Sequence, residues 1–577
     1  MKLVPGRRAG IALAAAVVLG GLFLVRVAAW RPPALGGEVP ADGYARASGV
    51  VHVHTTLSDG GGTPEEVIAA ARAARLAFVG ITDHNNLDAK PLEGYRDGVL
   101  VLVGSELSTP SGHVLGLGLE RDPVYRFNGD GLDALEDVRD LGGFSFAAHP
   151  FSRRVDLRFT GWDLPGPWGI EILNGDSEWR RAGPRLLLTA GLFRINPSYA
   201  LLQSLTPPEE ALARWDAMLA RRDVVGLAGA DAHSRLPVTK SWTLRVPPYE
   251  SLFLLFQNHL LLERPLSGDA AADRAAVLGA LGGGRFYVGL DALAPADGFS
   301  FTVEADGGRR WTMGDHLPVV SGARVRVGGR MPKGTRLVLL RDGRPLAEAR
   351  ERLDVPLAGQ GVYRVEARVE GWGLPWVVTN PVYVFDEPSA EERRRAAAWP
   401  APPVVGETTP LEALHGSPAF GAEHDPSSWM DPQVVTPDAG PGGGVALKLA
   451  FRLAAPSPSQ IFTWCALVNR QPRDLGGYAG LRFRIRADGE YRVWVQVRDV
   501  NRASADEGLE WWLASVRTST EWREVVLPFS RFRTINRKTD GRLDPDRTQA
   551  LVFVLDGAAV KVGTEGTIWL ADVGVSR

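Results

Sequence analysis

The sequence predicts a multidomain protein in which an α/β region is followed by all-β regions. Its 577 residues exceed what a single hydrophobic core supports, so about two to four domains are expected. Between residues 44 and 296, apolar strand-like runs alternate with helical stretches, which is typical of a parallel sheet, either open or closed into a barrel. From residue 297 onward the apolar segments are strand-like, which predicts β-sandwiches.

Composition narrows the class of protein. Hydrophobic residues make up 45% of the chain and charged residues 23%, which is ordinary for a globular protein. The formal net charge of −2 gives no reason to expect a nucleic-acid partner. Cys465 is the single cysteine, so no disulfide within the chain is expected.

The N-terminus, residues 1–30, has the layout of an export signal, because basic residues precede an apolar run over residues 11–25. The run is short for a membrane span and VAA at 27–29 is a poor cleavage site, so a cleaved signal peptide and a retained membrane anchor both stay open. Either way the body of the protein is expected at the periplasmic or extracellular face. Residues 31–43 are rich in proline and glycine and predict a linker.

The first strand of the α/β region ends in a histidine pair. In VVHVHTTLSDGG, His52 and His54 are two residues apart, and side chains at that spacing share one face of a regular strand. Asp59 follows in a glycine-rich turn. The next stretch predicts a helix, because Thr63 suits the N-cap and Pro64 the first helical position.

Five of the strand-like runs carry residues of metal-ligand type at or near their C-terminal ends. These residues are His52 and His54, then His84, Glu106, His149, and finally Asp231 with His233. Barrels of alternating strands and helices build their active sites at that edge, where side chains from several strands converge. The pattern therefore predicts a metal site rather than scattered structural histidines.

Four ordered segments resemble the motifs of the PHP (polymerase and histidinol phosphatase) superfamily: HVHTTLSDG, ITDHN at 81–85, AAHP at 147–150 and GADAH at 229–233. The resemblance covers residues 47–291 and implies a distorted (β/α)7 PHP barrel over 44–296 with two or three divalent metal ions. One ion would take His52, His54, Glu106 and Asp231, a second Glu106, His113 and His149, and a third Asp59, His84 and His233. Amidohydrolase barrels also open with His-x-His, but they use a bridging lysine from the fourth strand, which here ends in His149.

The ligand types and the resemblance together suggest hydrolysis. Imidazole and carboxylate ligands without thiolate suit Mn, Fe or Zn. The resemblance implies a metal-bridging hydroxide as nucleophile. Asp231 would also orient that hydroxide, and Glu171 is a candidate to protonate the leaving atom. Asn174, Arg153 and Arg235 are candidate substrate contacts, with a hydrogen-bonded loop or a solvated arginine as the competing interpretation.

Residues 297–386 predict a small β-sandwich, in which Asp342 and Gly343 are a hairpin signal. The closing segment, YRVEA followed by PWVVTNPVYVF, resembles the CehA/McbA branch of PHP metallohydrolases, whose namesakes hydrolyse the carbamate ester carbaryl. A charged, proline-containing linker is expected at 387–403.

Residues 404–577 predict a second β-sandwich, since Leu481, Phe483 and Ile485 alternate with arginines. The stretches WREVVLPFSRF, LDPDRTQALVFVLD and GTIWLADVGVSR resemble galactose-binding-like jelly rolls of the carbohydrate-binding type. Seven of the 17 tryptophans lie in this region, and aromatic faces stack on sugars. Contact with a glycan or the cell envelope and a plain structural role both stay open.

The sequence as a whole predicts an exported, metal-dependent hydrolase that cleaves a phosphoester. The alternatives are a carboxyl- or carbamate-ester hydrolase of the CehA type, and a non-catalytic envelope-binding or scaffold protein. The expected partner is a small ester or phosphoester substrate, and association with a nucleic-acid polymerase is not expected.

Overall fold

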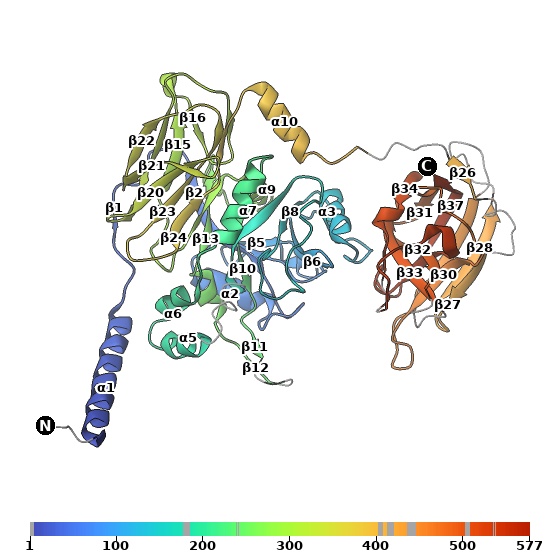
Figure 1. Cartoon of the computed structure of the whole chain (residues 1–577), viewed down its shortest axis with the longest axis horizontal. Coiled ribbons are helices and arrows are strands. Elements are labelled where there is room, and N and C mark those ends of the chain that lie inside the picture. The colour runs from blue at the N-terminus through green and yellow to red at the C-terminus, as the bar shows by residue number, and fades with distance from the viewer. Residues whose placement is uncertain are drawn as a thin grey trace. The chain divides into compact units, whose positions relative to one another are not determined.

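The chain forms two compact units. The computed structural model describes residues 5–176, 185–237, 239, 242–401, 408–411, 420–435, 446–501, 508–534, 536 and 538–577 (Figure 1). Unit 1 consists of Met1–Arg121 and Ala134–Trp399, and unit 2 of Asp122–Asp133 and Pro400–Arg577. The predicted multidomain organisation is therefore confirmed.

The N-terminal segment is a single helix, α1 (Pro5–Ala29), drawn in dark blue in Figure 1. Its large apolar side chains between residues 13 and 25 are exposed, whereas Val27 is buried against Leu192 and Ala200. The Asn196 side chain donates hydrogen bonds to the carbonyls of Val27 and Trp30, which fixes the end of the helix to unit 1. Among the described residues, no helix combines the length and apolar character needed to cross a membrane.

Eight strands of unit 1 pair around a closed barrel. Parallel ladders join β2 to β3, β3 to β5, β8 to β9, β9 to β10, and β10 back to β2, while β6, β7 and β8 pair antiparallel. An isolated parallel bridge between His84, just after β3, and Glu106 of β6 joins these two segments. The strands are β2 (Ala45–Val53), β3 (Phe78–Ile81), β5 (Val99–Val103), β6 (Ser105–Thr109), β7 (Gly112–Leu117), β8 (Phe144–Ala147), β9 (Trp168–Asn174) and β10 (Gly226–Ala232).

The barrel strands are buried on both faces, which explains their nearly continuous apolar character. The helices of this region are α2 (Pro64–Ala73), α3 (Gly131–Asp140), α5 (Arg185–Phe193), α6 (Pro197–Ser204), α7 (Glu209–Leu219), α8 (Tyr249–Phe253) and α9 (Ala270–Gly283). The predicted start of α2 is confirmed: Thr63 is the N-cap, Pro64 is at its first position, and Glu66 completes a capping box.

The second part of unit 1 is built directly onto the barrel sheet. Strand β13 (Gln257–Leu262) pairs with β2 and with β14 (Phe286–Gly289), and β14 pairs with β24. The sheet continues through β17 (His316–Leu317), β20 (Arg336–Arg341), β21 (Arg344–Arg350), β23 (Gly361–Arg368), β24 (Pro375–Thr379) and β25 (Val382–Val384). A four-stranded sheet shares its core and contains β15 (Phe299–Glu304), β16 (Arg310–Thr312), β18 (Arg324–Gly329) and β22 (Leu353–Pro356).

Local details of this part agree with the hairpin prediction and differ from the linker predictions. Asp342 and Gly343 join β20 to β21 with φ of 52° and 74°, the left-handed geometry of a tight hairpin. Within the expected 31–43 linker, β1 (Leu35–Gly36) pairs with β19 (Met331–Pro332). Within the expected 387–403 linker, α10 (Glu387–Ala397) forms and buries Arg393, which binds Asp223. The remaining short strands are β4 (Gly94–Arg96), β11 (Leu236–Pro237) and β12 (Thr243–Leu244).

Unit 2 is a β-sandwich of two sheets, drawn in orange and red in Figure 1. The first sheet has β26 (Thr408–Pro410), β28 (Trp429–Val435), β29 (Ala446–Arg452), β31 (Gly480–Ala487), β34 (Arg523–Pro528) and β37 (Glu565–Ser576). The second has β27 (Phe420–His424), β30 (Trp464–Asn469), β32 (Arg492–Val500), β33 (Leu509–Arg517), β35 (Arg533–Thr534) and β36 (Thr548–Asp556). Leu481, Phe483 and Ile485 point into the core, so the predicted alternation and the β-sandwich are confirmed.

Candidate metal centre

The predicted ligands lie at the ends of the barrel strands, but the strands are irregular there. His52, His149 and Asp231 have φ of 65°, 29° and 46°, which is the left-handed region that side chains rarely adopt. The ladders of β2 with β3 and with β10 shift register beside His52 and Asp231. His52 and His54 still converge, although the regular i, i+2 geometry expected for them does not apply. Strained residues of this kind cluster at functional sites.

Glu106 is the centre of the cluster and is buried, with 1% of its surface exposed. Its Oε1 lies 2.7 Å from His149 Nε2 and 2.8 Å from His113 Nδ1. Its Oε2 lies 3.0 Å from His54 Nε2 and 3.1 Å from His52 Nε2. His84 Nδ1 lies 3.3 Å from the same Oε2, so one carboxylate contacts five imidazoles, as a bridging ligand would.

The ligand atoms form three overlapping groups, within each of which the atoms lie within 4.8 Å of one another. The first group has the composition expected for the first ion: His52, His54, Glu106 and Asp231. The second is His84, Glu106 and His113, where His149 was expected in place of His84. The third is the expected Asp59, His84 and His233 together with His54.

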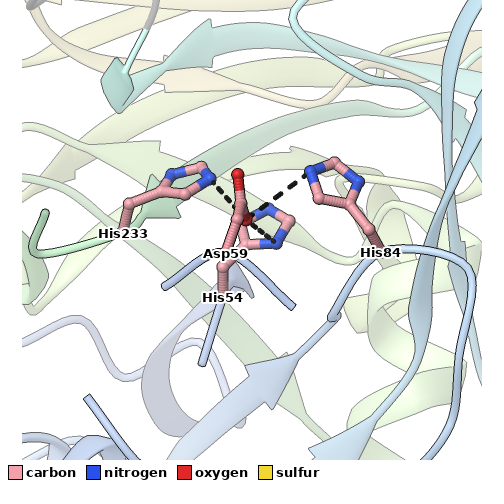
Figure 2. A group of neighbouring side chains, drawn as sticks. All are labelled: His54, Asp59, His84 and His233. Carbon is pink, nitrogen blue, oxygen red and sulfur yellow. Dashed lines mark ion pairs between the residues drawn. The ribbon is translucent and has the colours of Figure 1, made fainter. Parts of the chain in front are cut away.

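The third group includes Asp59, the most exposed of the ligand candidates, so it is the open side of the cluster. Figure 2 shows its four side chains. The Asp59 carboxylate lies between the rings, with Oδ1 3.2 Å from His233 Nε2 and 3.7 Å from both His84 Nε2 and His54 Nδ1. The Asp59 side chain is 48% exposed, whereas that of His54 is fully buried. A ligand from solution therefore meets Asp59 first.

The electrostatics of the cluster favour a cation. Burial raises the pKa of Glu106, but the neighbouring imidazoles of His52, His149 and His113 outweigh it and hold that pKa well below its usual range. Burial likewise lowers the pKa of His52, and the carboxylates of Glu171, Glu106 and Asp231 outweigh it, so that this pKa is raised well above the ordinary value. The negative potential that retains a proton on these rings would equally attract a metal ion.

His84 and His233, at the open side of the cluster, have pKa values shifted in opposite directions. Burial is the main reason that the pKa of His84 is lowered to about 4. For His233, burial also lowers the pKa, but a side-chain hydrogen bond with Asp59 and the charge of Asp231 raise it to about 9.

Several ligand atoms are buried without a hydrogen-bond partner. Among the described residues these include His52 Nε2, His54 Nε2, Asp59 Oδ1 and His149 Nδ1. Buried polar atoms are rarely left unpaired, because desolvation without a partner costs about 1–3 kcal/mol each. The donor set contains imidazoles and carboxylates and no thiolate, so the residues present fit a divalent transition-metal ion.

Among the predicted catalytic and substrate-binding residues, Glu171 and Asn174 have surroundings different from those expected. Glu171 is 1% exposed and its two oxygens are taken by His52, His149 and Asn174, which leaves it no access to substrate as a proton donor. Asn174 is buried and donates to Glu171 rather than facing the open side. Arg153 and Arg235 are exposed, and Arg235 Nη1 donates to the carbonyl of Asp59 at 2.9 Å.

Two residues outside the ligand set, Tyr249 and Asp83, hold the ligand segments in place. The hydroxyl of Tyr249, in α8, lies 2.7 Å from the carbonyl of His54 and 3.0 Å from that of His233, and thereby joins two ligand strands. Asp83 accepts hydrogen bonds from the backbone and side chain of Thr55, both at 2.7 Å, and so fixes the turn after His54. The SDGG turn itself needs glycine, because a Cβ on Gly60 would lie 2.3 Å from the His54 carbonyl.

Comparisons with known proteins find similarities to parts of the chain. No family model matches the chain. An uncharacterized protein of Methanocaldococcus jannaschii is 29% identical over 142 residues, which is 22% of this chain and 80% of that protein. A family 11 carbohydrate-binding module of a Clostridium thermocellum cellulosomal cellulase is 16% identical and covers 30% of this chain and 96% of its own, with a TM-score of 0.24. A family 30 module of another cellulase of that organism is 18% identical and covers 30% and 93%, with a TM-score of 0.21.

Proposed function

We propose that unit 1 is a metal-dependent hydrolase of the PHP type that cleaves a phosphoester. The observation that carries the proposal is the convergence of imidazole and carboxylate groups on Glu106, with buried lone pairs of His52, His54 and His149 that have no partner within the described residues. The closed barrel of parallel and antiparallel strands supports the distorted (β/α)7 architecture that the sequence motifs imply.

The residues that would hold two or three ions of Mn, Fe or Zn are the three groups around Glu106. When bound, close divalent ions lower the pKa of a shared water and offset charge on the attacking and leaving oxygens. Asp231, whose Oδ1 lies 3.5 Å from both His52 Nε2 and His54 Nε2, would help to hold an ion of the first group and would also orient the attacking oxygen.

The chain's own residues shape the approach of substrate. The buried floor of His52 and His54 excludes bulk water, so a phosphoester would enter over Asp59, His84 and His233. Arg235 lies on that side, bonded to the Asp59 carbonyl, and its guanidinium suits an anionic substrate. His233 Nδ1 lies 3.0 Å from the Asp231 carbonyl, which holds its proton there and leaves Nε2 toward Asp59.

One observation favours carboxyl- or carbamate-ester hydrolysis of the CehA type as the second candidate. The strands of 297–386 extend the barrel sheet through β14 and β24, so the sandwich is an integral part of unit 1. This arrangement supports the resemblance of that segment to the CehA/McbA branch.

Export and envelope contact complete the proposal. The exposed apolar side chains of α1, among them Leu13, Val17 and Leu22, suit recognition by the export machinery or a lipid surface. On the outer face of unit 2, Trp511 is half-buried with Arg498 3.9 Å over its ring, and such a platform suits a sugar. Retention of a Trp511→Ala variant on polysaccharide gels, compared with the parent chain, tests the glycan contact.

The hydrolase is tested with the full chain loaded with Mn²⁺ and assayed on aryl phosphate monoester, phosphodiester, carboxyl ester and carbamate. We expect turnover of a phosphoester that is lost in His149→Ala. His316→Ala is the matched control, because that histidine of unit 1 is about half exposed and lies outside the cluster. Metal binding without turnover of any class would refute the hydrolase in favour of the scaffold alternative.

A further inference from the structure

Glu171 is not part of the metal-ligand cluster, but it contacts two of the ligand candidates, His52 and His149. It belongs to β9, and its backbone pairs with Leu227 of β10. Oε1 lies 2.6 Å from His52 Nδ1, and Oε2 accepts hydrogen bonds from the His149 backbone N–H at 2.6 Å and from Asn174 Nδ2 at 2.8 Å. A carboxylate is an acceptor only, so these contacts account for its orientation.

The contact with His52 selects which ring nitrogen faces the cluster. Because Glu171 accepts, a proton is held on His52 Nδ1, so Nε2 is the nitrogen left to bind a metal ion once its own proton is released. Nε2 faces Glu106 Oε2 at 3.1 Å and Asp231 Oδ1 at 3.5 Å. Nε2 has no hydrogen-bond partner within the described residues. A nitrogen and carboxylate oxygens that face one another attract a cation placed between them. A carboxylate that accepts from the other ring nitrogen, as Glu171 does here, commonly fixes the orientation of a histidine ligand.

The contact with His149 acts through the backbone instead. His149 has a φ of 29°, a strained value that needs support from its surroundings. Glu171 Oε2 holds its N–H, and the ring then projects so that Nε2 lies 2.7 Å from Glu106 Oε1. The same carboxylate therefore sets one ligand by its ring and another by its main chain.

The absence of a side chain at Gly229 independently supports a structural requirement for the Glu171 carboxylate at this position. A Cβ on Gly229 would lie 1.7 Å from Glu171 Oε1, so any side chain there would displace the carboxylate from His52. Gly229 opens the GADAH segment that also carries Asp231 and His233. The glycine of that motif thus makes room for Glu171.

From these contacts we infer that Glu171 is a positioning residue that fixes His52 and His149 as metal ligands, with Gly229 as the space that admits it. The inference rests on the proposed function, since it presumes that the cluster binds metal. It assigns Glu171 no contact with substrate.

The test is the affinity of the full chain for Mn²⁺, measured by titration calorimetry and by electron paramagnetic resonance of free Mn²⁺. In Glu171→Gln, one amide oxygen and one NH₂ replace two acceptors, so either orientation sets the NH₂ against the His52 Nδ1–H or the His149 N–H. We expect the Kd of at least one site to increase by about 10- to 100-fold. Asn174→Ala is the matched control, because it removes a donor from Oε2 and leaves both histidine contacts, and we expect a change below about threefold.

The outcomes separate the two proposals. If the parent chain binds no Mn²⁺, the proposed function fails and the inference falls with it. If the parent binds and Glu171→Gln binds equally well, the inference is refuted while the hydrolase stands. A purely structural role would lower the melting temperature of the metal-free protein without changing the Kd. If Glu171→Gln does not fold, Gly229→Ala carries the same test, because its Cβ displaces the same carboxylate.

Discussion

Replacing Arg364 by methionine should destabilise unit 1 strongly, because this arginine joins the barrel to its sandwich through a buried ion-pair network. Its side chain is 2% exposed. Nε and Nη2 bind Asp216 of α7 at 2.8 and 2.6 Å, and Nη1 binds Glu366 at 2.9 Å. The substitution leaves Asp216 without its guanidinium partner and Glu366 with Arg368 as its remaining partner. Breaking a buried pair in this way costs about 3–5 kcal/mol.

The measurement is urea unfolding of the full chain followed by circular dichroism. Arg350→Met is the matched control, since Arg350 pairs with Glu370 at 3.7 Å and both side chains are at least 70% exposed. An exposed pair contributes about 0–1 kcal/mol, so the control should unfold close to the parent. Equal midpoints for the two variants would refute the reasoning, because burial would then make no difference to the ion pair.

Three further predictions concern separate parts of the chain. Asn196→Ala should lower the stability of unit 1 by about 1–2 kcal/mol in the same assay, because the Val27 and Trp30 carbonyls lose their donor; an unchanged midpoint would contradict this. Gly60→Ala should remove about one equivalent of bound Mn²⁺ in titrations, because its Cβ meets backbone atoms and moves Asp59; full stoichiometry would argue against it. Burial, with the charges of Glu510 and Asp544, raises the pKa of Asp499 to about 6. The stability that protonated Asp499 gives unit 2 is therefore present below about pH 4 and is lost as the pH rises through 6. The pH dependence of unfolding should differ between the parent and Asp499→Asn over that window, and identical profiles would count against the assignment.

Features set by neighbours in the sequence were predictable. The Thr63 cap, the Asp342–Gly343 turn and the alternation at Leu481 each depend on a few adjacent residues, and each is confirmed. The residue types and order of the metal-ligand candidates also follow from local motifs. Their backbone geometry does not, because the register shifts beside His52 and Asp231 arise from pairing between strands far apart in the chain.

The surroundings of Glu171 could not be predicted for the same physical reason. Its partner His52 is 119 residues away, and nothing near Glu171 in sequence indicates that its carboxylate is enclosed. A strand-end glutamate was therefore interpreted as a catalytic acid, whereas the contacts favour a positioning role. Tyr249 is a similar case, since it reaches His54 across 195 residues. The linker prediction at 387–403 missed α10 because the burial of Arg393 beside Asp223 is a tertiary contact.

Backbone strain and unpaired buried atoms both destabilise the metal-free cluster, and together they predict the effect of metal removal on stability. Left-handed backbone at His52, His149 and Asp231 costs about 1–3 kcal/mol each, and the unpaired atoms around Glu106 add a desolvation cost. An ion that binds only the folded state offsets these costs, by about 2.7 kcal/mol per site at a hundred times its Kd. In calorimetry of the full chain, chelation should therefore lower the transition of unit 1, and Mn²⁺ should restore it. Unit 2 lies outside the cluster and serves as the internal reference, so equal shifts of both transitions, or none, would contradict a metal site in unit 1.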